Sequence, residues 1–513
     1  MHAHQDAASG CTHQQKSGPP AALRRWGRWL GACGALLLMA GCTAMAPVNP
    51  PLAQAGTQSG YHLIPLLKRQ KDAGNNPEAM VLLAFSGGGT RAAALSYGVL
   101  EEMRRTTITV AGHTHPMLDE VDLVAGVSGG SFTALAYALY GERLFDEYES
   151  RFLKRDVQGA LISRALSPSR WGPLGSELYG RSELASDYYD EILFGGATFG
   201  DLLTRKTPIA LVTGTDLSTG ARFEFSQDHF DLICSDLNTV RLARAAATSS
   251  AVPVVLSPVT YRNYGGRCGA AMPSWVEDVV RPDNPARPAG RALLRYREIR
   301  DLTDSAKRPY LHVVDGGVSD NLGLRGMLEA FEQLEASPQF QKELGLERLK
   351  HIVVIAVNSR SAPSTDWDRS PTPPGFAAQL LQSSSVPIDH FSYESVELLK
   401  DTAQRWANRR LLDIAHKRLQ GMTQAEAEAA VPRMTFDAID VSFDAIPDAA
   451  EQRYFMELPT SFVLPPEAVD RLRALGGRLL REAPAYQALL QRIGSLERER
   501  TAAPAPASAP VPR

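Results

Sequence analysis

The chain has 513 residues, of which 44% are hydrophobic and 22% are charged, and its formal net charge at pH 7 is −3. This length is sufficient for one large α/β domain with insertions or for two domains. The slightly acidic balance excludes a nucleic-acid-binding protein that relies on a basic surface. The sequence contains no cluster of residues with metal-ligand spacing.

The first 41 residues have the pattern of an export signal. Three arginines at positions 24, 25 and 28 precede an uncharged, mostly apolar stretch from Trp29 to Gly41, which is too short to span a bilayer, since about 20 residues are needed. Its end, Leu38-Met39-Ala40-Gly41-Cys42, resembles a bacterial lipobox. The resemblance implies cleavage before Cys42, a lipid anchor on Cys42 and attachment to the bacterial cell envelope, with Thr43 favouring the outer membrane. An ordinary secretory signal or an uncleaved anchor is the alternative.

Residues 42–77 are expected to be the lipidated N-terminus and a tether, rich at first in Pro, Ala, Gln and Gly. Cleavage before Cys42 would change the formal net charge from −3 to −6, because it removes four basic residues and one acidic residue. The mature chain would then have no broad basic face for anionic lipid. Membrane contact is therefore expected through the acyl anchor or through local apolar surface.

A buried strand followed by a glycine-rich loop is predicted next. Met80 to Phe85 is a continuous apolar run, and Ser86-Gly87-Gly88-Gly89-Thr90-Arg91 follows before a helix that begins near Ala92. Three consecutive glycines allow backbone N–H groups to point at one spot, where the helix N-terminus adds a positive dipole. Such a loop binds a phosphate or stabilises an oxyanion. The Gly-Lys-Ser/Thr of a P-loop is absent, and a dinucleotide fingerprint is matched only weakly.

A candidate nucleophile follows the next predicted strand, residues 121–125. Gly126-Val127-Ser128-Gly129-Gly130 is a Gly-x-Ser-x-Gly sequence, and residues 132–140 after it are typical of a buried helix. A serine on a tight strand-to-helix turn needs small neighbours, here Gly126 and Gly130, so that the backbone can bend and a carbonyl can approach. Alone, the pentapeptide is more typical of an ordinary glycine-rich strand-to-helix turn than of a nucleophile. Together with the glycine loop it favours acyl transfer, in which the loop stabilises the oxyanion.

Two further features lie between residues 209 and 320. Cys234 and Cys268 are the cysteines that remain beyond Cys42, and the sequence is compatible with a disulfide or with two free thiols. Tyr310 to Val314 is a predicted strand that ends in Asp315-Gly316-Gly317. An aspartate at this position lies at the edge where open α/β sheets bind ligands, although Asp-Gly also forms ordinary turns.

In this order, the glycine loop, the Gly-x-Ser-x-Gly sequence, the Ala247–Pro253 segment and Asp315-Gly316-Gly317 resemble the patatin-like phospholipase family, over about residues 78–360 and more weakly at 458–462. The resemblance implies a three-layer α/β/α fold with a mostly parallel central sheet. It also implies a Ser-Asp dyad, with Ser128 as the nucleophile and Asp315 as the general base, and no metal or other cofactor. The N–H groups of Gly87, Gly88 and Gly89 would form the oxyanion hole. Supporting roles are expected for Arg91, which would orient the loop or pair with a lipid phosphate, and for Gly126, Gly130, Gly316 and Gly317. One departure is Ala92, where the family usually has glycine.

The rival interpretation is a Ser-His-Asp triad on an α/β-hydrolase fold. His351 is the best-placed histidine for it, because it opens the predicted strand 352–357. Lipases of that fold commonly have His-Gly-Gly-Gly in the oxyanion loop, whereas Ser86 precedes the glycines here. The sequence therefore favours the dyad.

The resemblance thus implies a lipid acyl hydrolase of the phospholipase A or lysophospholipase type, which cleaves carboxylic esters of membrane lipids through an acyl-enzyme. No nucleic-acid partner is expected. An acyltransferase and a non-catalytic lipid-binding envelope lipoprotein are the alternatives. The expected organisation is a signal peptide (1–41), the lipidated tether (42–77), the catalytic core (78–360), a mainly helical extension with one late strand (361–500) and a disordered Ala/Pro tail (501–513). Residues 265–300 and 360–375 are expected to be loops, and residues 376–419 a long helical region.

Overall fold

The computed structural model describes residues 49–502 apart from 57–59, 73, 175–178, 274–289, 337–347, 363–364, 366 and 432–433. The expected signal peptide, the lipidated Cys42 and the Ala/Pro tail beyond Ala502 lie outside the described residues. All described residues belong to one compact unit. No helix within the described ranges is long and apolar enough to cross a membrane.

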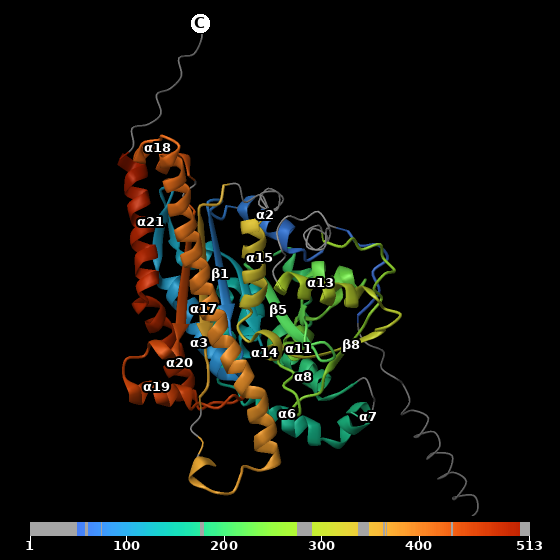
Figure 1. Ribbon diagram of the computed structural model, residues 1–513. Helices are drawn as coiled ribbons and strands as arrows, with labels where there is room; N and C mark the ends of the chain where they lie inside the picture. The colour runs from blue at the N-terminus through green and yellow to red at the C-terminus, as the bar shows by residue number, and fades with distance from the viewer. Residues whose placement is uncertain are drawn as a thin grey trace, which may run out of the picture. The chain divides into compact units, whose positions relative to one another are not determined.

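An eight-stranded sheet organises this unit (Figure 1), in the order β10-β9-β1-β4-β5-β8-β7 with β6 paired to β5. The strands from β10 to β5 pair in parallel, whereas β8 pairs antiparallel with both β5 and β7. The mostly parallel sheet expected from the sequence is confirmed. The strands are β1 (Ala79–Phe85), β4 (Val121–Val127), β5 (Ile209–Asp216), β6 (Arg222–Glu224), β7 (Val259–Arg262), β8 (Tyr310–Asp315), β9 (His351–Asn358) and β10 (Thr435–Ser442), and β2 (Thr107–Val110) forms a separate hairpin with β3 (His113–Pro116).

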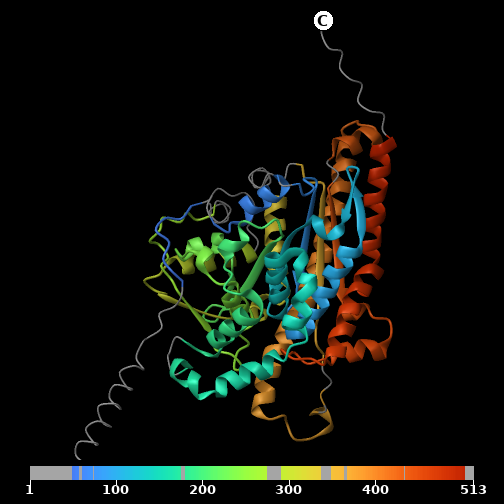
Figure 2. The same cartoon turned by 180° about the vertical axis from the view of Figure 1, so that it is seen from behind.

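Helices cover both faces of the sheet, which gives the expected three layers (Figures 1 and 2). One layer contains α3 (Gly89–Arg105), α4 (Gly129–Tyr140) and α20 (Pro466–Glu482), which packs along α3. The other contains α15 (Leu324–Ala336) and α17 (Phe376–Leu419). The remaining helices are α2 (Leu63–Asp72), α5 (Leu144–Tyr148), α6 (Val157–Leu166), α7 (Trp171–Leu174), α8 (Arg181–Tyr189), α9 (Phe199–Leu202), α10 (Gln227–Leu232), α11 (Leu242–Ser249), α13 (Gly290–Thr303), α14 (Gly317–Asp320), α18 (Gln424–Ala430), α19 (Ala449–Met456) and α21 (Pro484–Ala502).

The sheet is built from both halves of the chain. The one late strand expected within residues 361–500 is β10, which forms one edge of the sheet beside β9. The parallel strands β1, β4, β5 and β9 are almost fully buried, as their apolar runs indicate, whereas the edge strand β10 is mostly half-buried. The C-terminal region therefore contributes a strand to the central sheet.

One expectation about secondary structure is wrong. Residues 290–300 were expected to belong to a loop, but they form most of α13. Ile299 and Leu302 are buried on one side of this helix, three positions apart, as helical periodicity requires. The Pro/Arg/Gly-rich composition of the preceding residues concealed this short periodic segment.

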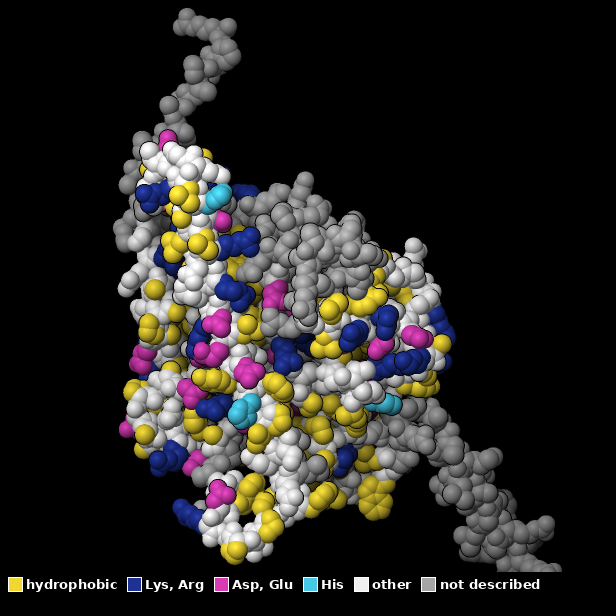
Figure 3. All heavy atoms as spheres, in the orientation of Figure 1, with side chains coloured by type: hydrophobic (Ala, Val, Ile, Leu, Met, Phe, Trp, Pro, Cys, Tyr) yellow, Lys and Arg dark blue, Asp and Glu magenta, His cyan; other side chains and the backbone are white. Residues whose placement is uncertain are grey.

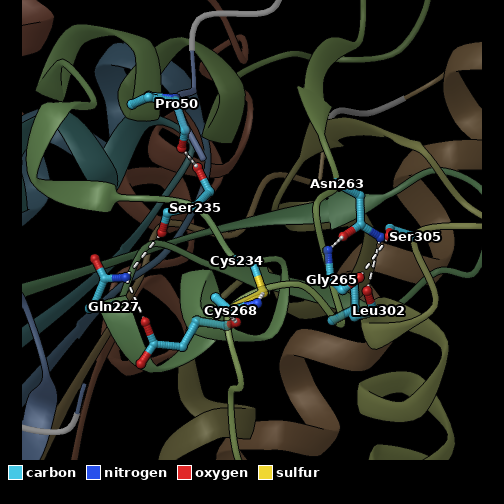
Figure 4. The surroundings of a disulfide bond; sticks show 10 residues. Pro50, Gln227, Cys234, Ser235, Asn263, Gly265, Cys268, Leu302 and Ser305 are labelled. Atoms are coloured by element: carbon cyan, nitrogen blue, oxygen red, sulfur yellow. Dashed lines mark hydrogen bonds between the residues drawn. A yellow bond between two sulfur atoms is a disulfide. The ribbon is translucent and has the colours of Figure 1, made fainter. Parts of the chain in front are cut away.

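Cys234 and Cys268 form a disulfide next to the start of the described chain (Figure 4). Their Cα atoms are 5.5 Å apart. The Leu52 N–H donates to the Cys234 carbonyl and the Ala55 N–H donates to the Cys268 carbonyl. The disulfide thus holds together the loop on which residues 50–55 lie.

Candidate active site

Ser128 lies on a sharp turn between β4 and α4. Its backbone has φ 48° and ψ −118°, a conformation that costs energy for any residue with a side chain. The glycines on either side fit this turn because the backbone passes close by. A Cβ on Gly130 would lie 2.6 Å from the Phe85 carbonyl oxygen, and one on Gly126 would lie 2.8 Å from the Gly130 carbonyl oxygen. The turn therefore has the tight backbone geometry that the Gly-x-Ser-x-Gly sequence predicts for a nucleophile elbow.

Asp315 is the hydrogen-bond partner of the Ser128 side chain. The Ser128 hydroxyl donates to Asp315 Oδ2 at 2.9 Å, and the Gly317 N–H donates to Asp315 Oδ1 at 2.8 Å. Only 6% of Asp315 and 5% of Ser128 are exposed. Gly316 fits because a Cβ there would lie 2.4 Å from the Thr213 carbonyl oxygen in β5. The fold thus brings together two residues that are far apart in the sequence.

Burial changes the chemistry of the Asp315 carboxyl group. Loss of hydration raises its pKa from 3.8 to about 6, against the lowering effect of the hydrogen bonds from Gly317 and Ser128. At neutral pH the group is still mainly ionised. Because its pKa is higher, the Asp315 carboxylate is a stronger base than an aspartate in water. A general base is also most effective when its pKa is close to the working pH.

The glycine loop lies beside the elbow. Gly88 has φ 138° and Gly89 has φ 59°, values that residues with side chains rarely adopt. A Cβ on Gly129 would lie 2.1 Å from the Gly89 carbonyl oxygen, and one on Gly87 would lie 3.2 Å from Ser128 Cβ. The Ala92 departure does not disturb the loop, because Ala92 already lies inside α3.

Two of the three backbone N–H groups expected to form the oxyanion hole are available to bind an oxyanion. The Gly87 N–H donates to the Asn321 carbonyl at 2.9 Å, so the expectation that all three glycines offer a free N–H is wrong for Gly87. The Ser128 N–H is also engaged, by Ser249 Oγ at 2.8 Å. Within the described ranges, the N–H groups of Gly88 and Gly89 have no hydrogen-bond partner. These two groups can stabilise an oxyanion.

Arg91 links the glycine loop to Ser359 and to the 458–460 segment. Its Nε donates to the Ser359 carbonyl at 2.9 Å, its Nη1 to the Leu458 carbonyl at 2.5 Å and its Nη2 to Thr460 Oγ1 at 3.1 Å. Burial lowers the pKa of the guanidinium to about 10, so it remains charged at neutral pH. Of the two roles considered for Arg91, orienting the loop fits these contacts, and a pairing with lipid phosphate does not.

Two residues at the site were not singled out from the sequence. Ser249 accepts the Ser128 N–H, and Asn321 accepts the Gly87 N–H through its carbonyl and donates from Nδ2 to Ser392 Oγ in α17 at 3.1 Å. Ser249 lies in the small-residue segment 247–253, and Asn321 follows Asp315-Gly316-Gly317 closely. In the sequence, their closeness to these two motifs was the signal that could have identified Ser249 and Asn321 as site residues.

The structure separates His351 from Ser128. His351 pairs with Ala79 at the start of β1, whereas Gly126 pairs with Phe85 at the end of β1. Six residues along a strand correspond to about 20 Å. His351 instead contacts Thr435 Oγ1 through Nδ1 at 2.9 Å. No histidine in the part of the chain that the structure describes is hydrogen-bonded to Ser128 or Asp315.

Comparisons with known proteins give one informative match. Residues 83–328 match the family described as Patatin-like phospholipase. None of the curated proteins compared with the chain matches significantly. Among solved structures, human GIVD cytosolic phospholipase A2 is similar with 14% identity and a TM-score of 0.41, over 88% of this chain and 69% of that one. VipD from Legionella pneumophila has 11% identity and a TM-score of 0.27, over 88% and 72%.

A structure of ExoU with SpcU from Pseudomonas aeruginosa is similar with 17% identity and a TM-score of 0.20, over 52% of this chain and 60% of that one. These structural similarities are too low to carry an argument by themselves. The family match stands on its own, and it spans both Ser128 and Asp315. Over residues 83–328, the chain is thus similar to the patatin-like phospholipase family.

Proposed function

We propose that this protein is a lipid acyl hydrolase that cleaves carboxylic esters with a Ser128–Asp315 dyad. The observation that carries the proposal is the 2.9 Å hydrogen bond from the Ser128 hydroxyl to Asp315, on a strained elbow beside two unpaired glycine N–H groups. The match of residues 83–328 to the patatin-like phospholipase family supports an ester of a lipid as the substrate.

In the first half of the reaction, Asp315 accepts the Ser128 proton as Ser128 Oγ attacks the ester carbonyl carbon. The N–H groups of Gly88 and Gly89 stabilise the negative charge that develops on the carbonyl oxygen. The tetrahedral intermediate then collapses, the C–O bond to the alcohol breaks, and the alcohol leaves with the proton from Asp315.

In the second half, Asp315 activates a water molecule that attacks the acyl-enzyme. Collapse of the second tetrahedral intermediate releases a fatty acid and returns the proton to Ser128. The same base serves both steps, since it is neutral after the first attack and charged again when the alcohol has left.

We place this activity in the bacterial cell envelope, with the chain anchored by a lipid on Cys42. The export-signal pattern of residues 1–41 and the lipobox-like sequence support this location. The Cys234–Cys268 disulfide also supports it, because disulfides persist mainly in oxidising compartments outside the cytoplasm.

The test combines active-site labelling with analysis of lipid products. A fluorophosphonate should label the wild-type protein but not Ser128→Ala, and Asp315→Asn should lower ester hydrolysis by a factor on the order of 10⁴. His351→Ala is the matched control and should retain most of the rate. Loss of activity in the histidine variant, with activity retained in Asp315→Asn, would refute the dyad.

Product analysis separates hydrolysis from its alternatives. Incubation with envelope lipids should release free fatty acid in a Ser128-dependent manner. Faster appearance of acylated lipid acceptors would indicate an acyltransferase. Absence of both label and product in folded protein would indicate a lipid-binding protein without catalysis.

A further inference from the structure

The first part of α17 extends beyond the edge of the sheet that carries Ser128. The helix begins after β9 ends, and it leads through α18 to the start of β10, so it runs opposite to these parallel strands. Ser392 marks the level of the active site, because its Oγ accepts a hydrogen bond from Asn321. The sixteen residues from Phe376 to Phe391 precede it and extend about 24 Å at 1.5 Å per residue. Residues 376–393 are called the α17 arm below (Figure 1).

The composition of the arm is unusual for a helix in water. The sequence from Ser370 to Ile388 contains no Asp, Glu, Lys or Arg, whereas the later part of α17 is rich in all four. None of the described residues from Phe376 to Phe391 is buried, and the exposed large apolar side chains of the arm include Phe376 (80%), Val386 and Tyr393. Exposed helix faces are normally charged or polar. An uncharged exposed helix with large apolar side chains suits contact with an apolar phase.

Other exposed apolar side chains surround the same edge. Val254 is 60% exposed in the loop after Ala251, whose carbonyl accepts the Asp315 N–H. Val318 follows Asp315 by three residues and is also exposed. Val463 is exposed two residues after Ser461, whose carbonyl accepts the Thr90 N–H, and Ile162 and Leu166 are exposed on α6, whose Gln158 N–H donates to the Phe462 carbonyl. Figure 3 shows hydrophobic side chains at the lower end, where Figure 1 places α6, α7 and the start of α17.

The opposite edge of the sheet has a different surface. Leu411, Leu412 and Leu419 are exposed near the end of α17, but they lie among Arg and Lys side chains. These leucines are single apolar residues on a charged surface, which is common in soluble proteins. They provide a matched control on the same helix.

The start of the described chain lies toward the active-site edge. Asn49 donates from Nδ2 to the Arg262 carbonyl at 2.8 Å, and Arg262 pairs with Tyr310. β8 runs antiparallel to β5, and its Val313 pairs with Asp216, the last residue of β5. Tyr310, three residues before Val313, therefore lies past the C-terminal end of β5, on the active-site side of the sheet. Cys42 is seven residues before Asn49, so a lipid on it would be held within about 25 Å of Asn49.

We propose that the α17 arm, with the apolar rim around Ser128, docks on a lipid bilayer surface and positions the active site for lipid to enter from the membrane. The inference rests on the proposed function, which makes membrane lipid the substrate. A bilayer is the occupant that explains an exposed arm with no charged residue before Asp389, beside the proposed lipid esterase site and at the same edge as the start of the described chain.

Vesicle flotation tests the proposal with the full chain carrying Cys42→Ser, so that an acyl anchor does not contribute. The probe is phosphatidylethanolamine and phosphatidylglycerol vesicles. The arm variant, Phe376→Ser/Val386→Ser/Tyr393→Ser, should lower vesicle partitioning by at least about tenfold, because apolar insertion drives such binding. The control variant, Leu411→Ser/Leu412→Ser/Leu419→Ser, should change it by less than about twofold. Both should hydrolyse a soluble short-chain ester as the parent does.

Three outcomes would overturn the proposal: unchanged vesicle partitioning in the arm variant, an equal loss in the control variant, or a shift from dimer to monomer on gel filtration in the arm variant, which would make a second copy the occupant. The single Phe376→Ser variant, at a highly exposed position, decides the question if the triple variant does not fold. Loss of Ser128-dependent hydrolysis in the parent would refute the proposed function, while flotation would still test the arm independently.

Discussion

Asp315→Asn should make the protein more stable while it abolishes activity. The native state keeps the Asp315 carboxyl buried, which raises its pKa from 3.8 to about 6. Each pKa unit corresponds to about 1.36 kcal/mol, so ionised Asp315 costs the native state about 3 kcal/mol at pH 8. Asparagine has nearly the same shape, can accept the hydrogen bond from the Gly317 N–H and carries no charge. The free energy of unfolding should therefore rise by up to about 3 kcal/mol at pH 8.

The pH dependence makes this prediction specific. Between pH 3.8 and about 6, native wild-type protein holds a proton that the unfolded chain has released. Wild-type stability should therefore fall relative to the variant as pH rises through this window, and the two should be equally stable below it. Urea denaturation of both proteins from pH 3.5 to pH 8 measures the difference. A variant that is less stable than wild type at pH 8, or a difference that does not shrink toward acid pH, would refute the reasoning.

Four further changes test the same geometry. The value of kcat/KM should rise with pH through about 6 and then level off, because Asp315 must be ionised to act as a base, and a pH–rate profile with a soluble ester measures this. Arg91→Ala should lower the free energy of unfolding in urea by about 2–4 kcal/mol, because it leaves the buried Ser359 carbonyl and the half-buried Leu458 carbonyl without their donors. Gly88→Ala should lower kcat by a factor on the order of 10² or more, because it forces a side chain into a positive-φ position of the oxyanion loop; a variant with wild-type kcat would remove Gly88 from that role. Cys234→Ala/Cys268→Ala should lower the free energy of unfolding by about 2–4 kcal/mol by opening a 34-residue loop, while fluorophosphonate labelling of folded protein should persist.

The local chemistry of the site was readable from the sequence. Gly126-Val127-Ser128-Gly129-Gly130 predicts a tight strand-to-helix turn, because its small residues permit a backbone that other residues resist. The apolar runs at β1, β4, β8 and β9 predict buried strands by their composition alone. Each of these features depends on residues that are neighbours in the chain.

Tertiary structure decided everything that depends on distant partners. In the folded chain the Gly87 N–H donates to the Asn321 carbonyl, and Arg91 is buried beside the glycine loop. His351 lies at the end of β9 that is distant from Ser128, and the uncharged start of α17 extends beyond the edge of the sheet. No local pattern determines these contacts, because they follow from strand order, register and the packing of helices on the sheet. The sequence by itself determined which side chains and turns are available for chemistry, and the packing of distant segments determined which of their hydrogen-bonding groups remain free to perform it.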